Sequence, residues 1–265
     1  MIGAIIGDIA GSRFEFNNYR KKDFEIFHKN SFITDDSIMS LAVAKAVFEY
    51  KTNGEDLEKA AIRYMQEYGK PYPSCGFGGQ FFFWIYGKNP KPYNSFGNGA
   101  AMRVSACAYA ADSLEEAVSM SNAVTKVSHN HPEGIKGAEA VTAAIYLAKS
   151  GSSIKDIRNY ITENYYPLNF TIDEIRSSYD FNETCQGTVP EAIEAFVESN
   201  SFEDAVRTAV SVGGDSDTLA AITCSIAEAY YGVPEQMYNK ALTYIDERLM
   251  PLLIEFEKKF GSYIK

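Results

Sequence analysis

Two clusters of acidic and hydroxyl residues, far apart in the chain, carry the side chains best suited to bind a cation. The first is Thr34-Asp35-Asp36-Ser37, and the second is Gly213-Gly214-Asp215-Ser216-Asp217-Thr218. Each precedes a run of apolar and small residues, 38–48 and 219–227, which is typical of a helix buried on most of its faces. Carboxylates at the start of two buried helices need a compensating charge, because an isolated buried charge is very costly. We therefore predict that the clusters are two halves of one site.

The ligand types indicate which cation this site would hold. Oxygen ligands without paired His or Cys favour Mg²⁺, Mn²⁺ or Ca²⁺ over zinc. The alternative is that each cluster only caps a helix, since Asp, Ser and Thr are common N-caps and carboxylates in the first turn suit the helix dipole. Capping needs only one such residue, whereas the dense pattern occurs twice. The repetition favours a shared metal site.

The segment 69–102, rich in glycine and aromatic residues, contains a second candidate binding element. In it, Ser95-Phe96-Gly97-Asn98-Gly99 precedes an expected helix over 100–111. Its small residues and free backbone N–H groups could hold a phosphate, assisted by the helix N-terminus. A tight Asn-Gly turn between two helices is the alternative. We expect part of the aromatic run, 82–86, to lie in the core on one helical turn.

Three further residues have side chains suited to chemistry. His129 and His131 are spaced i, i+2 and cannot share a helix face, so a paired-His zinc site is not expected. A histidine in this loop could instead hydrogen-bond a sugar or phosphate, or simply brace the loop. Glu15 lies between Phe14 and Phe16. Apolar neighbours raise the pKa of a carboxyl group and suit it to proton transfer, although a surface glutamate is the alternative.

The elements that position these residues are expected to be helices. Residues 57–68 have apolar positions at the i, i+3, i+4, i+7 spacing of a helix with one buried face. Sustained period-two alternation is absent, which argues against a substantial sheet. We predict an all-α fold, a single domain over 1–265, with the motif-bearing helices at its centre and amphipathic helices outside. Residues typical of helix starts are Ser113, Ser153, Thr171, Pro190, Ser201 and Pro234.

Composition excludes several classes of protein. The chain has 265 residues, 46% of them hydrophobic and 23% charged, as is ordinary for a globular protein. A net charge of −10 argues against general nucleic-acid binding, which needs a basic face, although a bound metal can reverse the local field for an anionic ligand. The chain lacks a continuous apolar run long enough for a membrane span, and its first ten residues lack the basic flank of a signal peptide.

The four cysteines are scattered without the spacing of a zinc site. We expect them to be reduced and mostly buried, in a cytoplasmic protein that is a monomer.

Taken in order, these motifs resemble those of the ADP-ribosylglycohydrolase family, the helical group that includes the dinitrogenase reductase-activating glycohydrolase and the ADP-ribosyl-acceptor hydrolases. The resemblance extends over residues 3–231, and the ordered set of motifs is more specific than any one of them. The matching stretches are Gly7-Asp8, Gly11, Glu15, Thr34-Asp35-Asp36, Gly97-Asn98-Gly99-Ala100-Ala101-Met102-Arg103, Ser128-His129 and Gly214-Asp215-Ser216-Asp217-Thr218.

The resemblance implies an all-α fold around two Mg²⁺ or Mn²⁺ ions. One helix start would supply the ligands Thr34, Asp35 and Asp36, and the other would supply Asp215, Asp217 and Thr218. Glu15 would lie beside the metals as a gating or proton-transferring carboxylate. For the substrate, the resemblance places the diphosphate and adjacent ribose on Ser95, Gly97, Asn98 and Gly99, adenine on Phe96, and the distal ribose near His129.

Two departures from the family pattern are conservative. Ala100 stands where many relatives have a second glycine, and Ser37 stands where threonine is also common. Neither change removes a metal ligand.

The chemistry implied by the resemblance is hydrolysis of a glycosidic bond. The metals would anchor ribose hydroxyls and orient a water molecule, and carboxylates would stabilise an oxocarbenium-like transition state. Either Glu15 or Asp35 would transfer the proton. The expected substrate is an ADP-ribosylated protein side chain or a related small ADP-ribosyl compound, and the sequence does not identify the acceptor.

Two other functions remain open. A dimetal phosphohydrolase would use the same oxygen ligands on a phosphate. A non-catalytic ADP-ribose-binding protein of the same fold is the third possibility, and the oxygen side chains at all six metal positions argue against it.

Overall fold

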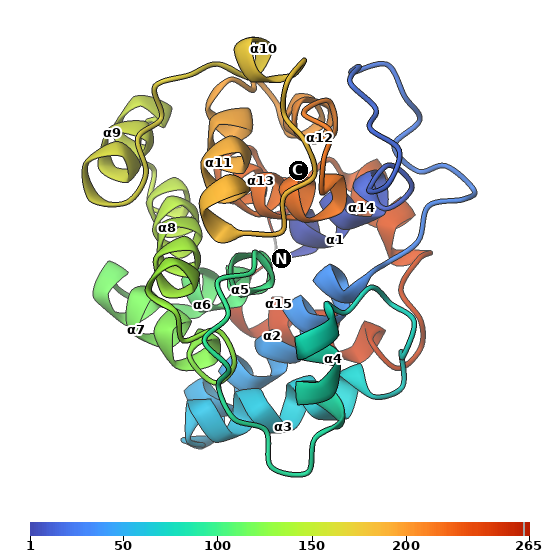
Figure 1. Cartoon of the computed structure of the whole chain (residues 1–265). Helices are drawn as coiled ribbons and strands as arrows, with labels where there is room; N and C mark the ends of the chain where they lie inside the picture. Colours follow the sequence, from blue (N-terminus) through green and yellow to red (C-terminus); the bar gives the residue numbers. More distant parts are fainter. Residues whose placement is uncertain (262) are drawn as a thin grey trace.

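The computed structural model describes residues 1–261 and 263–265, and throughout this range the regular secondary structure is helical (Figure 1). The only pairings of β type among these residues are two isolated bridges, Gly97 with Thr184 and Val233 with Ile264. The predicted all-α fold is confirmed. The helices are α1 (Ile2–Gly11), α2 (Asp35–Asn53), α3 (Leu57–Gly69), α4 (Gly79–Tyr86), α5 (Gly99–Met102), α6 (Ser105–Ala110), α7 (Leu114–Thr125), α8 (Pro132–Lys149), α9 (Ile154–Asn164), α10 (Ile172–Ile175), η1 (Cys185–Gly187), α11 (Val189–Val197), α12 (Phe202–Val210), α13 (Ser216–Tyr231), α14 (Glu235–Leu242) and α15 (Met250–Phe260).

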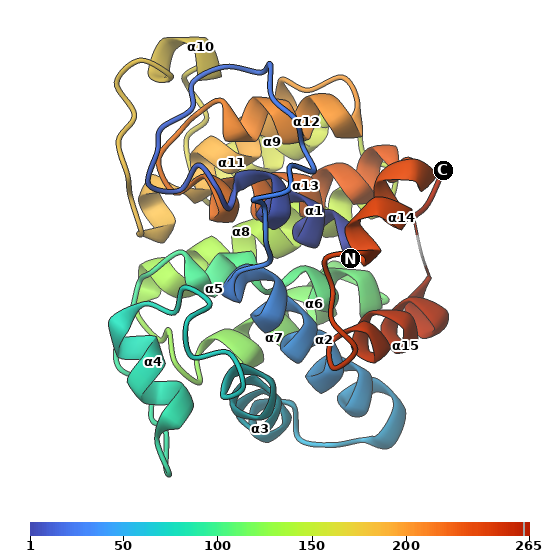
Figure 2. The ribbon, with the colours of Figure 1, turned by 90° about the vertical axis from the view of Figure 1, so that its right-hand side faces the viewer.

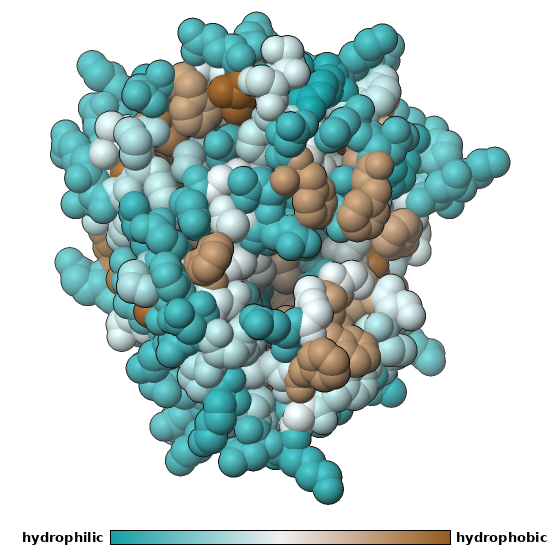
Figure 3. Space-filling model, viewed as in Figure 1, coloured by the Kyte–Doolittle hydropathy of each residue, from teal (hydrophilic) through white to brown (hydrophobic). Residues whose placement is uncertain are grey.

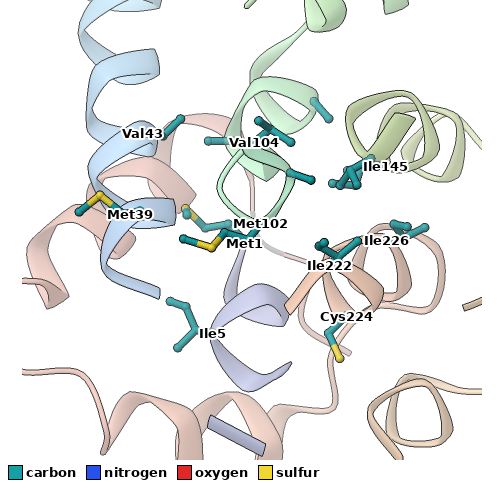
Figure 4. Packing of buried hydrophobic residues seen from close by; sticks show 14 of the residues in the cluster. Met1, Ile5, Met39, Val43, Met102, Val104, Ile145, Ile222, Cys224 and Ile226 are labelled. Carbon is teal, nitrogen blue, oxygen red and sulfur yellow. The ribbon is translucent and has the colours of Figure 1, made fainter. Parts of the chain in front are cut away.

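The centre of the fold is a pair of helices from opposite ends of the chain, α1 and α13. They lie side by side in Figures 1 and 2, and α13 also contacts α8, α11 and α12. Every residue of α1 is buried, as is α13 from Ser216 to Ala229. Apolar side chains of these two helices meet those of α2 and α8 in one core, which Figure 4 shows for Ile5, Ile222, Met39 and Ile145.

Three glycines spaced four residues apart allow this close packing. A Cβ on Gly3, Gly7 or Gly11 would lie within 2.2–2.4 Å of a backbone oxygen of α13. Because those atoms belong to the backbone, no side-chain rotation would relieve the clash. This row of glycines, Gly3, Gly7 and Gly11, which we call the glycine seam, therefore brings Asp8 and the loop after α1 next to the start of α13.

The second motif-bearing helix, α2, is also interior, as predicted. Its residues from Asp36 to Val47 are buried with one exception, and it packs against α1, α3, α6 and α15. Thr34 is its N-cap, with its hydroxyl accepting from the N–H of Asp36 at 3.2 Å. Both acidic clusters thus lie at the first turns of buried helices.

The outer helices begin where the sequence predicts. Ser113, Ser153, Thr171 and Ser201 each cap a helix by accepting a backbone N–H three residues later. The predicted first-turn prolines lie at the first turn of α11 and at the N-cap of α14. In α3 the buried residues, Leu57, Ala60, Ala61, Tyr64 and Met65, follow the predicted face. All four cysteines are free and three of them are buried, as expected.

One local expectation is wrong, and another holds only for Trp84 and Ile85. The helix expected over 100–111 is divided into α5 and α6, with the break at Arg103 and Val104. The core face of the aromatic helix α4 consists of Phe81, Trp84 and Ile85, because 3.6-residue periodicity turns Phe83 outward with 76% of its surface exposed. None of the helices within 1–261 combines the length and the hydropathy needed to cross a bilayer.

The glycine seam can be tested by unfolding. Gly7→Ala places a methyl group against the carbonyl of Ala220, so the two helices must separate, and we expect the unfolding free energy to fall by about 3 kcal/mol. Gly79→Ala is the matched control, since a Cβ there meets no atom within 4 Å. Urea denaturation of both variants measures the difference. Equal midpoints would show that the α1–α13 contact is not as tight as described.

Candidate active site

A cavity of about 540 Å³ opens where the first turns of α2 and α13 meet the segment 93–99. Figure 3 shows this face hollowed near its centre, with both hydrophilic and hydrophobic side chains around the hollow. All the predicted site residues line the cavity except Thr34, which is the N-cap of α2 and directly precedes the lining residue Asp35. The lining residues predicted from sequence are Glu15, Asp35, Asp36, Ser95, Phe96, Gly97, Asn98, Gly99, His129, Asp215, Asp217 and Thr218.

The acidic side chains converge at the base of this cavity. One oxygen from each of Glu15, Asp215 and Asp217 lies within 4.8 Å of the other two. The two helix starts are linked directly, since the Thr218 hydroxyl donates to Asp36 Oδ2 at 3.1 Å. The two clusters therefore form one site, as their repetition in the sequence indicates.

Burial raises the pKa of each carboxyl group in the cluster, and repulsion from neighbouring carboxylates raises it further for Glu15, Asp35, Asp36 and Asp217. Burial, then the charges of Asp215 and Asp8, raise the pKa of Glu15 to about 7. Burial and the neighbouring Asp8 raise the pKa of Asp35 to about 8. For Asp36 and Asp217, burial and adjacent carboxylates raise the pKa well above its usual value.

These observations fit a divalent cation held by oxygen ligands. Asp36 Oδ1 is buried and has no hydrogen-bond partner among the described residues, which is unfavourable for a carboxylate oxygen unless a cation approaches it. A cation at this position would also reverse the repulsion that raises the pKa values. The donor set of carboxylate and hydroxyl oxygens is the type that Mg²⁺ and Mn²⁺ prefer.

Asp8 is a member of the site that sequence reasoning did not assign. It is fully buried on α1 and accepts from the Thr34 N–H and hydroxyl, both at 2.8 Å, and from the Ser37 N–H at 3.1 Å and the Ser37 hydroxyl. Because the Thr34 hydroxyl proton is donated to Asp8, the oxygen keeps a lone pair for a cation. A charged residue inside an otherwise apolar opening helix was the signal that could have identified it.

Gly76 allows the chain to pass close to Asp35. Its φ is +117°, and a Cβ there would lie 2.7 Å from Asp35 Oδ1. Only glycine fits this approach, which explains one of the glycines in the segment 69–102.

The segment Ser95 to Gly99 is tied to the acidic cluster rather than standing free. The Asn98 side-chain amide donates to Asp215 Oδ2 at 2.6 Å and to the Thr188 hydroxyl at 3.1 Å. The backbone N–H of Gly97 donates to Ser95 Oγ at 3.1 Å. That of Asn98 donates to the carbonyl of Glu183 at 2.7 Å. The expectation that these two N–H groups are free is therefore wrong.

Phe96 and His129 occupy different positions along the cavity wall. The Phe96 side chain is 41% exposed, and its ring centroid lies 5.0 Å from that of His131. His129 is buried, and its Nε2 faces Gly97 and Gly99: a Cβ added to either glycine would lie 3.6 or 3.7 Å from this nitrogen. The exposed ring can accept a stacked base, and the histidine can reach only a ligand inside the cavity.

Comparison with known proteins identifies the family. The model of the ADP-ribosylglycohydrolase family matches residues 1–260. The chain belongs to the ADP-ribosylglycohydrolase family. Among individual relatives of this family member, human ADP-ribosylhydrolase ARH3 is 24% identical, with 89% of this chain and 85% of the human protein covered.

Two further comparisons agree with this assignment. ADP-ribosylarginine hydrolase Tri1 of Pseudomonas putida is 25% identical over 88% of this chain and 70% of its own length. A solved structure described as an ADP-ribosylglycohydrolase-related protein complex superimposes with a TM-score of 0.69 at 19% identity, covering 97% of this chain and 95% of its own. The structural match confirms the all-α fold of the family.

The role of Asp8 in this ADP-ribosylglycohydrolase can be tested by Asp8→Asn. The side-chain oxygen of the asparagine can replace Asp8 Oδ2, which accepts three hydrogen bonds. The asparagine NH₂ group would then take the place of Oδ1 and face the Thr34 hydroxyl, which would have to turn and accept instead of donating. We expect unfolding free energy to fall by about 2 kcal/mol and divalent-metal affinity to weaken.

The matched control is Asp56→Asn, because Asp56 is an exposed N-cap of α3 and asparagine caps a helix equally well. Urea denaturation and calorimetric titration with Mn²⁺ measure both effects. Wild-type metal affinity in Asp8→Asn would contradict the role assigned to Asp8.

Proposed function

We propose that this protein is a metal-dependent hydrolase that cleaves the glycosidic bond of an ADP-ribosylated side chain or a related small ADP-ribosyl compound. The observation that carries the proposal is the convergence of carboxylates from two buried helix starts at the base of a cavity whose wall is the Ser95 to Gly99 segment. Membership of the ADP-ribosylglycohydrolase family supports the reaction class. We also propose that residues 1–265 form a single domain.

Two Mg²⁺ or Mn²⁺ ions are the cofactors we propose. Thr34, Asp35 and Asp36 would hold them from α2, and Asp215, Asp217 and Thr218 would hold them from α13. When bound, such ions supply positive charge that binds adjacent ribose hydroxyls and activates a water molecule. The buried, unpartnered Asp36 Oδ1 and the Thr34 oxygen oriented by Asp8 support this ligand set.

During cleavage, the carboxylates of the chain would stabilise positive charge on the sugar and transfer a proton. Glycosidic bonds break through an oxocarbenium-like transition state, which nearby negative charge stabilises. Glu15 is only partly buried and lines the cavity, so its carboxyl group can reach a water molecule or the ligand and can take and return a proton. Asp35, which lines the same cavity, is the second candidate for this role.

The cavity wall would bind the rest of the ligand. We place the diphosphate and its ribose along Ser95, Gly97, Asn98 and Gly99, adenine against the exposed Phe96 ring, and the distal ribose near His129. Since Asn98 also donates to Asp215, one residue would join the ligand wall to the metal site.

The acceptor is left open between a protein side chain and a small compound. One relative is named an ADP-ribosylarginine hydrolase and another simply an ADP-ribosylhydrolase. Product analysis after incubation with ADP-ribosylated arginine, ADP-ribosylated serine and ADP-ribose-1″-phosphate, with and without Mg²⁺, would identify it. Cytoplasmic location, a monomeric state, and the absence of nucleic-acid and membrane partners stay predictions from composition.

Substitution of the metal ligands tests the reaction. Asp36→Ala and Asp217→Ala should each reduce ADP-ribosyl hydrolysis by at least about a hundredfold, because a missing ligand displaces an ion and with it the substrate ribose. The fold should persist, since removing one carboxylate lessens repulsion in the metal-free protein.

Glu115→Ala is the control, because Glu115 is also a first-turn carboxylate but is exposed on α7. Turnover of a competent substrate and circular dichroism are the measurements. Near wild-type turnover in both site variants would rule out the metal mechanism.

Base recognition distinguishes this function from a phosphohydrolase that binds only phosphate. Phe96→Ala should weaken ADP-ribose binding by about 1–3 kcal/mol, the range for a lost base–aromatic stack. Ribose-5-phosphate, which has no adenine, should bind wild type and variant alike. Phe83→Ala is the control, because its side chain is 76% exposed on α4 and does not line the cavity. Equal losses for both ligands, measured by calorimetric titration, would count against adenine stacking.

A further inference from the structure

Arg103 is a fully buried charged residue whose position the proposed reaction does not explain. It follows α5 at the break before α6, and none of its surface is exposed. Within the described part of the chain it forms no ion pair with a carboxylate, and its Nε and Nη1 have no hydrogen-bond partner. A buried guanidinium without a carboxylate is unfavourable for folding, so its presence here calls for another explanation.

The polar contacts of Arg103 all lead to the loop that carries His129. Its Nη2 donates to Ser128 Oγ at 2.8 Å and lies 3.2 Å from His129 Nδ1. Ser128 Oγ is in turn 2.8 Å from the same Nδ1. The guanidinium carbon lies 5.0 Å from the Phe81 ring centroid, so the aromatic face of α4 holds the cation in place.

This geometry favours one protonation state of His129. Arginine donates and cannot accept, so an Nδ1 that faces the Arg103 N–H must offer its lone pair. Because Ser128 Oγ already accepts from Arg103, its own O–H is free to donate to Nδ1. The imidazole proton is then on Nε2, the nitrogen that lies closest to Gly97 and Gly99 at the cavity wall.

We propose that Arg103 is a positioning residue that fixes His129 as a neutral imidazole whose Nε2–H donates into the ligand cavity. The effect on a ligand rests on the proposed function, whereas the tautomer does not. The other groups facing the imidazole are the rings of Phe81 and Tyr93, with centroids 5.9 and 5.7 Å away. Neither carries a negative charge at neutral pH. Burial, followed by the charge of Arg103, lowers the pKa of His129 well below its usual value, in agreement with the neutral form.

A fixed donor has a clear use at this wall. The Gly97 and Asn98 N–H groups donate within the chain, so a donor from another element adds a hydrogen bond that these two groups cannot give to an oxygen of the ligand. A histidine free to exchange its proton between the two nitrogens would present a lone pair there for part of the time. Arg103 removes that alternative.

Nitrogen-15 NMR of the imidazole groups tests the tautomer directly. The chain has three histidines, and in His131 the backbone N–H of Glu133 donates to Nδ1 at 3.1 Å, independently of Arg103. His131 therefore serves as an internal control for the fold of the loop. We expect His129 of the wild type to be neutral and protonated on Nε2 between pH 6 and 8. An Nδ1–H or imidazolium form of wild-type His129 would overturn the proposal without any variant.

Variants separate Arg103 from Ser128. In Arg103→Met the Ser128 hydroxyl can accept from Nδ1, so a substantial Nδ1–H population should appear while the His131 signals stay unchanged. In Arg103→Lys and in Ser128→Ala a cation still faces Nδ1, and the Nε2–H form should persist. An unchanged tautomer in Arg103→Met would overturn the proposal. Loss of the Nε2–H form in Ser128→Ala would do the same, and this variant decides the matter if Arg103→Met fails to fold.

Ligand affinity supplies the second readout. If Arg103 acts through His129, Arg103→Met and His129→Ala should each weaken ADP-ribose binding about tenfold, the effect of one lost hydrogen bond. The double variant should lose no more than either single one, because the two residues act through one donor. Additive losses would contradict the positioning role. Failure of wild type to bind ADP-ribose would overturn the proposed function while leaving the tautomer result intact.

Discussion

Mutual repulsion among buried carboxylates is the constraint on which the account of this protein depends. Asp8, Asp36 and Asp217 are buried, and Glu15 and Asp35 lie at the edge of the same cavity. Burial raises the pKa of each of these groups, and the adjacent carboxylates raise that of every one except Asp8, so the cluster is unfavourable when all are ionised. A fold that gathers such groups requires either retained protons or a bound cation. Oxygen ligands at the starts of two interior helices are suited to the cation.

The rest of the architecture holds those helix starts together. The glycine seam on α1 lets that helix lie directly on α13, which places Asp8 where it can orient Thr34 at the cap of α2. Asn98 then connects Asp215 to the segment that lines the cavity. These contacts form one series. The packing of α1 on α13 positions Asp8, Asp8 orients Thr34, and Asp215 is bonded to the segment that lines the cavity.

Much of this arrangement can be predicted from the sequence because its signals are local. Helix caps such as Ser113 and Thr171 need only a hydroxyl and a nearby backbone N–H, and the repeated acid-and-hydroxyl pattern indicates one shared site. What the sequence does not reveal depends on contacts between distant residues. The partners of Asp8 lie 26 and 29 residues away, and the acceptor for the Asn98 N–H lies beyond residue 180. The break between α5 and α6 coincides with the buried Arg103, whose contacts with Ser128 and His129 also lie far along the chain.

The central claim is that divalent cations hold the acidic cluster together, and the most direct test is calorimetric titration of Mg²⁺ or Mn²⁺ into chelator-treated protein, followed by thermal unfolding. The account predicts saturable binding that approaches two ions per chain. It also predicts a rise in melting temperature with metal concentration, equivalent to about 2.7 kcal/mol when the free ion is at a hundred times its Kd. The absence of binding heat, together with a melting temperature unchanged by millimolar Mg²⁺ and Mn²⁺, would contradict it.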